Sequence, residues 1–237
     1  MDNALFGKSA AGEFVGVAAL DTIGLVSANL DPGLRGKMGL PAHVRAVGTI
    51  SSRTGAAGQI LAVDEALKAT RAELITVELP RDTKGWGGHG CYILIGSDTV
   101  SDVRRAVEIA LSLIDKHCGE VYISEAGHLE FAYSAGAGEA LHRAFSAPIG
   151  RAFGFMAASP ASIGLIMADR ALKSSNVTLI DYGTPDHKTS HSNEVMIWFS
   201  GETSDTKNAV LTARECGYEL LCSLGSTPKS PGESYIK

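Results

Sequence analysis

The stretch Arg45-Ala46-Val47-Gly48 decides the fold, because it returns 106 positions later as Arg151-Ala152-Phe153-Gly154. Further matches keep the same order along the chain: Ser27-Ala28 with Ser134-Ala135, Asp64 with Asp169, Ala66-Leu67-Lys68 with Ala171-Leu172-Lys173, Leu74-Ile75 with Leu179-Ile180, Pro80 with Pro185, Gly96 with Gly201, Ser101-Asp102 with Ser204-Asp205, and Ala106-Val107 with Ala209-Val210. Ordered self-similarity of this kind is typical of a duplicated structural unit. We therefore predict two tandem domains, at residues 13–119 and 120–224, and a C-terminal tail at 225–237. The tail is rich in Ser, Pro and Gly, which predicts a loose surface segment.

Each copy repeats one pattern of helices and strands. In the first copy we expect strands at 46–51, 73–79 and 91–95, helices at 58–70 and 101–115, and a glycine-rich loop at 81–90. In the second copy we expect Ser159 to be the N-cap of the first helix, with Pro160 at its first position, Leu165, Ala168 and Leu172 buried, and a strand at 195–199. The predicted fold class is α/β, an α+β sandwich in which helices pack on a mostly antiparallel sheet in each copy.

Composition excludes several classes of protein. The 237 residues carry a formal net charge of −5, so a basic face for nucleic acid is not expected. The uncharged run 152–168 is shorter than the roughly 20 apolar residues of a membrane-spanning helix and is interrupted by Pro160. The four cysteines form no CxxC pair and no export signal precedes them, which predicts reduced thiols in a cytosol rather than a disulfide framework or a zinc site.

Some short motifs suggest chemistry that their surroundings do not support. Gly85–Gly90 satisfies G-x-G-x-x-G, but it precedes a strand rather than a helix, so no helix N-terminus is available for a pyrophosphate. A glycine-rich loop instead suits close approach between backbones. His187 and His191 stand four residues apart in a loop and favour a solvent-facing role over a metal site, and Cys91 favours a buried filler over a nucleophile.

Longer runs of sequence resemble a known family. These runs are Glu13-Phe14-Val15-Gly16, Asp21-Thr22-Ile23-Gly24-Leu25-Val26, Ser52-Arg53-Thr54-Gly55-Ala56, Glu78-Leu79-Pro80-Arg81-Asp82-Thr83-Lys84-Gly85, Ser101-Asp102-Val103-Arg104-Arg105-Ala106-Val107, Glu125-Ala126-Gly127-His128 and Ser192-Asn193-Glu194-Val195. They resemble the tandem-domain shell proteins of bacterial microcompartments, most closely the type called PduB in propanediol-utilising and EtuB in ethanol-utilising compartments.

The resemblance implies a non-catalytic tile with two shell domains in permuted strand order. It implies a homotrimer with pseudo-sixfold symmetry that lies beside other shell proteins around enzymes in the cytoplasm, with no cofactor and no nucleic-acid or membrane partner. It also implies that a lysine at the end of the first helix contacts the next tile, a role that falls on Lys68 and Lys173.

In single-domain relatives, the loop between the two central strands lines a pore at the symmetry axis. The residues that the resemblance assigns to the pore and to a ligand are Asp82, Thr83, Lys84, Gly85, Trp86, Gly87, Gly88 and His89 in the first copy, and Asp186, His187, Lys188, Thr189, Ser190, His191, Ser192 and Asn193 in the second. Polar groups there could hydrogen-bond a small uncharged metabolite such as glycerol, propanediol or ethanol. The alternative is a metabolite-binding regulator or enzyme on a duplicated α/β scaffold, with His89, His187 or His191 as functional groups.

Overall fold

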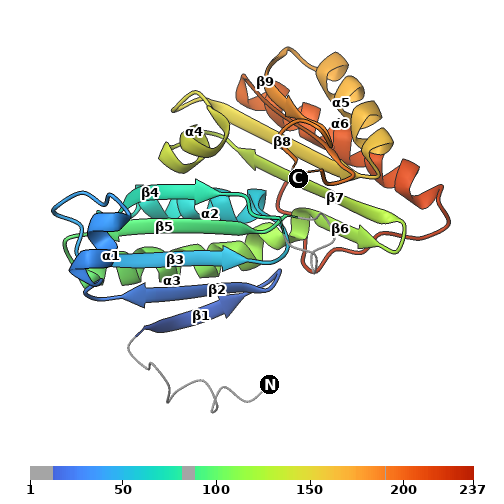
Figure 1. Ribbon diagram of the computed structural model, residues 1–237. Helices are drawn as coiled ribbons and strands as arrows, with labels where there is room; N and C mark the ends of the chain where they lie inside the picture. Colours follow the sequence, from blue (N-terminus) through green and yellow to red (C-terminus); the bar gives the residue numbers. More distant parts are fainter. Residues whose placement is uncertain (1–12, 82–88, 190) are drawn as a thin grey trace.

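The computed structural model describes residues 13–81, 89–189 and 191–237, which form two five-stranded antiparallel sheets with helices packed on them (Figure 1). The first sheet has the spatial order β1-β2-β3-β5-β4. Its strands are β1 (Phe14–Ala18), β2 (Thr22–Ser27), β3 (Ala46–Ser52), β4 (Glu73–Glu78) and β5 (Cys91–Ser97). The second sheet has the equivalent order β6-β7-β8-β10-β9. Its strands are β6 (Val121–Ser124), β7 (Gly127–Ser134), β8 (Ala152–Ser159), β9 (Val177–Gly183) and β10 (Val195–Gly201).

Two long helices cover one face of each sheet, as the helical periodicity predicted. The helices are α1 (Pro32–Lys37), α2 (Ala57–Lys68), α3 (Val100–His117), α4 (Glu139–Phe145), α5 (Ala161–Ser174) and α6 (Thr203–Cys222), with a short 3-10 helix η1 (Cys118–Glu120) between the two sheets. Helices α2 and α3 pack against each other on the first sheet, and α5 and α6 pack against each other on the second. The predicted α/β fold class is confirmed.

Strand register relates the two copies residue by residue. Ile23 lies opposite Ser51 in the first sheet, and Glu130 lies opposite Ala157 at the same place in the second. Leu74 pairs with Ile95 as Leu179 pairs with Phe199. The register therefore makes Ser97, not Gly96 as the sequence match indicates, the counterpart of Gly201. Since α2 and α5 are both unbroken helices, the match of Asp64 with Asp169 fixes the correspondence along their whole length.

Two expectations for α5 are wrong. Ser159 is the last residue of β8 and pairs with His128, so Pro160 is the N-cap and the helix begins at Ala161. Leu165 is 61% exposed, because it lies on the side of α5 that faces neither the sheet nor α6. Ala168 is buried, as expected, whereas Leu172 is only partly buried.

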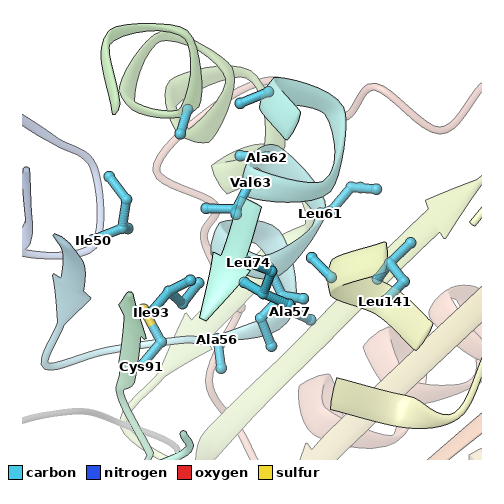
Figure 2. Close-up of a cluster of buried hydrophobic side chains, with 14 of the residues drawn as sticks. Ile50, Ala56, Ala57, Leu61, Ala62, Val63, Leu74, Cys91, Ile93 and Leu141 are labelled. Atoms are coloured by element: carbon cyan, nitrogen blue, oxygen red, sulfur yellow. The ribbon is translucent and has the colours of Figure 1, made fainter. Parts of the chain in front are cut away.

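The core of the first domain extends into the second. Figure 2 shows Leu141, from α4 of the second copy, in the same apolar cluster as Ala57 and Leu61 of α2 and Ile93 of β5. These side chains are buried, and each large one stabilises the fold by roughly 1.5–3 kcal/mol. The two domains therefore share a junction formed by α2 on one side and by α4 and β7 on the other.

The C-terminal tail is not the loose surface segment that its Ser, Pro and Gly content predicted. The side chain of Ile236 is 1% exposed, and its backbone N–H donates to Glu120 at 2.9 Å. Arg214 donates to the same carboxylate at 3.1 Å and to the carbonyl of Ile236 at 3.0 Å. Tyr235 packs against His117 at a ring separation of 4.6 Å. The tail is held because Ser234 and Ile236 donate hydrogen bonds to one oxygen of the buried carboxylate of Glu120, which would otherwise be left without these donors.

The described part contains no helix long and apolar enough to cross a membrane. Its four cysteines, Cys91, Cys118, Cys216 and Cys222, carry free thiols.

Candidate functional site

A pocket lies in the junction between the two domains. The volume open to the centre of a water molecule is about 30 Å³, which is about twice the volume that one ordered water needs. Both copies supply its walls: Thr54, Gly55, Ala56, Ala57, Leu79 and His89 come from the first, and Val121, His128, Glu130, Phe145, Phe155, Ala157, Glu194 and Met196 from the second. The lining is mostly apolar with a few polar groups.

Glu194 is the most buried charged group of this pocket. It directly precedes β10, so the sheet fixes its backbone, and its side chain is 3% exposed. One carboxylate oxygen lies 2.5 Å from Nδ1 of His89, and the other lies 3.5 Å from Nε2 of His128. The carboxylate therefore bridges a histidine from each domain.

The pKa values of this group favour an ion pair. Burial raises the pKa of Glu194, but hydrogen bonding to His128 and His89 and the charges of both rings outweigh it and leave the pKa below its ordinary value. Burial lowers the pKa of His89, and the contact with Glu194 outweighs it and leaves that pKa raised. The two opposite shifts favour a protonated His89 beside an ionised Glu194.

Glu130 supplies a second carboxylate to the pocket. It stands on β7 and accepts hydrogen bonds from the backbone N–H groups of Ala56 at 3.1 Å and Ala57 at 2.8 Å, at the start of α2. A carboxylate at a helix N-terminus is stabilised by the unpaired amides and by the helix dipole. Glu130 therefore joins the domains and fixes one wall of the pocket.

Two buried ring nitrogens of the pocket have hydrogen-bonding capacity left. Nε2 of His89 and Nδ1 of His128 have no hydrogen-bond partner among the described residues. A buried polar atom without a partner costs about 1–3 kcal/mol. A water molecule or the hydroxyl group of a ligand would remove that cost.

The structure places the predicted pore residues in different surroundings. Positions 82–88 and 190 lie outside the described residues, which covers Asp82, Thr83, Lys84, Gly85, Trp86, Gly87, Gly88 and Ser190. Of the others, His89 lines the junction pocket, Thr189 and Ser192 are buried, and Asp186, His187, Lys188, His191 and Asn193 are exposed. The expected close approach of backbones is present at the end of the first loop, since a Cβ on Gly90 would lie 2.0 Å from the carbonyl oxygen of Ser52.

The second predicted loop is held by its own polar side chains. The hydroxyl of Thr189 donates to the carbonyl of Thr184 at 2.8 Å, and the side chain of Asn193 accepts from the N–H of Ala161 at 3.3 Å. Lys188 forms an ion pair with Asp181. These contacts shape the loop. His187 and His191 are exposed, and no cluster of three or more metal-ligating side chains occurs in the ranges that the structure describes.

The two predicted edge lysines occupy equivalent positions with different neighbours. Nζ of Lys68 lies 2.7 Å from Asp64 and donates to the carbonyl of Gly136, in the second domain, at 2.6 Å. Lys173 pairs with Asp169 at 2.7 Å and is 74% exposed. The role of both lysines at a tile edge stays a prediction.

Sequence reasoning missed His128, Glu130 and Glu194 as site residues. His128 and Glu194 stand in two of the runs that carry the family resemblance, and their place in these runs was the sequence signal that could have identified them. Their meeting depends on the packing of one domain against the other, which no spacing along the chain encodes.

Comparison with known proteins identifies the family. The model of the BMC domain matches residues 46–126 and 152–227. The chain is 50% identical over 224 residues to the bacterial microcompartment shell protein PduB of Citrobacter freundii, which covers 94% of this chain and 83% of that protein. The PduB shell protein of Limosilactobacillus reuteri is 42% identical over the full length of both chains.

Solved structures agree with the sequence matches. The crystal structure of EtuB from Clostridium kluyveri has a TM-score of 0.90 and 48% identity, covering 94% of this chain and 98% of that one. A trimeric bacterial microcompartment shell protein PduB has a TM-score of 0.88 and 42% identity, covering 94% and 99%. With two BMC domains matched over most of its length, the chain belongs to the family of bacterial microcompartment shell proteins.

Proposed function

We propose that the protein is a non-catalytic tile of a bacterial microcompartment shell, built from three copies with pseudo-sixfold symmetry. The observation that carries this proposal is the pair of equivalent domains packed side by side through one junction. Three chains with two such domains each supply six similar wedges of one ring. The trimeric relative, similar over nearly its whole length, supports the same number of copies.

The mass of the protein in solution tests the trimer. Light scattering at low concentration should give three times 24.7 kDa. A stable monomer or dimer would contradict the proposal.

Assembly into sheets tests the tile. Electron microscopy at high concentration should show sheets for the unaltered chain. Lys68→Ala and Lys173→Ala should remain trimeric and lose the sheets if these lysines join neighbouring tiles. Sheets that persist in both variants would remove the edge role from the lysines and leave the tile in place.

We further propose that the junction pocket binds a small uncharged hydroxylated metabolite and is part of its path through the tile. The free ring nitrogens of His89 and His128 suit hydroxyl groups, and the apolar wall suits a short carbon chain. Glycerol, 1,2-propanediol and ethanol fit this description. The loops at 82–89 and 186–193 remain predicted linings of openings at the ring axis.

Binding of glycerol and 1,2-propanediol tests this pocket. Saturation-transfer NMR with the intact protein should show contact with either polyol, and His128→Ala should weaken it at least tenfold. His187→Ala is the matched control, because His187 is exposed and lies outside the pocket. Equal weakening by both variants, or none by His128→Ala, would remove the pocket from the proposed path.

The alternative of a regulator or an enzyme is less well supported. Its three candidate histidines do not form one site: His89 lies in the junction, whereas His187 and His191 are exposed on the second loop. The family match favours the structural role.

A further inference from the structure

We propose that His89 and Glu194 form a latch that closes the junction pocket, and that loss of a proton from His89 opens the pocket to its ligand. This inference rests on the proposed binding of a small hydroxylated metabolite and concerns how that binding is regulated. Three observations carry it: the small volume of the pocket, the position of the two side chains across the junction, and the burial of their charges.

The pocket is too small for the ligand proposed for it. Its volume of about 30 Å³ takes roughly two water molecules. Glycerol and 1,2-propanediol are both several times larger than a water molecule. Either polyol therefore enters only after the walls of the pocket have moved apart, so the structure shows the closed state of this site.

The walls that have to separate belong to different domains, and two polar contacts join them across the pocket. Glu130 accepts hydrogen bonds from the backbone N–H groups of Ala56 and Ala57, and Nδ1 of His89 lies 2.5 Å from a carboxylate oxygen of Glu194. Backbone amides do not titrate, so the first contact changes only when its carboxylate is protonated in acid. The second contact also depends on the proton of an imidazole, the side chain whose charge changes nearest neutral pH.

The latch holds firmly while both partners are charged, because it is removed from water. The side chains of His89 and Glu194 are 10% and 3% exposed. A buried carboxylate that loses its charged partner is left uncompensated, at a large cost in free energy. Loss of the proton from His89 therefore favours a state in which water reaches Glu194, and this state is the open pocket.

The other titratable side chains of the described walls act on the same equilibrium. Burial lowers the pKa of His89, but the hydrogen bond and charge of Glu194 and the charge of Glu130 outweigh burial and leave this pKa raised. His128 lies 3.5 Å from the second oxygen of Glu194 and stays beside it when the domains part, because both belong to the second domain. The remaining wall residues carry no charge. The latch is therefore closed below the raised pKa of His89 and weakens as the pH rises through it.

Hydrogen exchange measures this opening without any ligand. In the unaltered protein, the protection of the backbone amides next to His89 and Glu194, corrected for the intrinsic effect of pH on exchange, should fall several-fold between about pH 6 and about pH 9. In His89→Gln and Glu194→Gln, each of which removes one charge of the latch, the protection should be low throughout this range. Either variant suffices if the other does not fold.

Binding of 1,2-propanediol tests the consequence for the ligand. Because only the open state binds, the apparent affinity is reduced by the fraction of the protein that is open. Saturation-transfer NMR should therefore show binding that strengthens several-fold over the same rise in pH in the unaltered protein, and binding that does not change with pH in the two variants. His43→Gln is the matched control and should keep the pH dependence. His43 forms the same kind of pair with Glu73, at 2.5 Å, but is 61% exposed and lies outside the pocket.

The outcomes separate the latch from the proposed function. Protection that does not change with pH in the unaltered protein would overturn the latch, and so would a variant whose protection still falls as the pH rises. Binding that changes with pH at constant protection would overturn it as well, because pH would then act on the contacts of the ligand rather than on opening. Protection that falls with pH in a protein that binds no polyol at any pH would support the latch and contradict the proposed ligand instead.

Discussion

Replacement of the buried Asp64 by alanine should weaken the junction between the domains more than replacement of any exposed residue by alanine. Asp64 stands on α2 with a fully buried side chain. Its carboxylate accepts hydrogen bonds from the backbone N–H groups of Gly138 at 2.9 Å, Ala140 at 3.0 Å and Leu141 at 3.2 Å. It thus caps α4 of the second domain from a helix of the first.

The size of the effect follows from these three contacts. Each buried N–H left without an acceptor costs about 1–3 kcal/mol, and removal of one partner from a buried charged group costs about 3–5 kcal/mol in total. Water can reach part of this site, because the neighbouring Lys68 is 45% exposed. We therefore expect Asp64→Ala to lower the free energy of unfolding by about 3–4 kcal/mol.

Urea unfolding followed by circular dichroism measures this free energy, with all variants at one protein concentration because assembly contributes to stability. Asp64→Asn, which keeps one acceptor oxygen, should fall between the unaltered chain and Asp64→Ala. Lys173→Ala is the control and should cost less than about 1 kcal/mol, since the Lys173–Asp169 ion pair is exposed on both sides and such pairs contribute little. An Asp64→Ala variant as stable as Lys173→Ala would refute the cap as a determinant of the junction.

Three further predictions concern the tail, the buried ion pair and a thiol. Ile236→Ala should lower the free energy of unfolding by about 2–5 kcal/mol and Leu224→Ala by less than about 0.5 kcal/mol, measured by urea unfolding, because only Ile236 is buried. Glu194→Gln should cost most between about pH 4.5 and 6.5. Below this window the charge of Glu194 is lost as the pH falls through its lowered pKa, and above it the stabilisation is lost as the pH rises through the raised pKa of His89. Thermal melts of both proteins across this pH range measure the difference in stability, and a difference that does not change with pH would contradict the prediction. Burial raises the pKa of Cys91 to about 12, so a thiol reagent should modify it only after unfolding, which mass spectrometry of labelled peptides can show.

Most of the fold could be predicted from the sequence. The strands at 46–52 and 91–97 and the helices at 57–68 and 100–117 lie within a few residues of their predicted bounds. These elements carry strong apolar periodicity, and the second copy repeats it independently. The predicted domain boundaries at 119/120 and 224/225 stay predictions.

The errors have a common physical cause. The periodicity of α5 correctly identifies apolar positions, but it does not say which neighbour covers them, so Leu165 was predicted to be buried. The composition of the tail is that of a loop, yet Ile236 and Tyr235 are bound by groups more than 100 positions away. Serine is a favoured N-cap residue, but Ser159 pairs with His128 as the last residue of β8 and therefore does not cap α5.

The sequence by itself determined the duplication, the order of helices and strands and the family, because these depend on local periodicity and on long runs of matching residues. Only the tertiary structure decided which copy of each repeated face is covered, and that His89, His128 and Glu194 meet in one pocket. The physical reason is that burial and the ionisation of buried groups depend on neighbours from distant parts of the chain. Two nearly equal helices, α2 and α5, therefore have opposite environments: one lies inside the chain's own junction, and the other remains exposed.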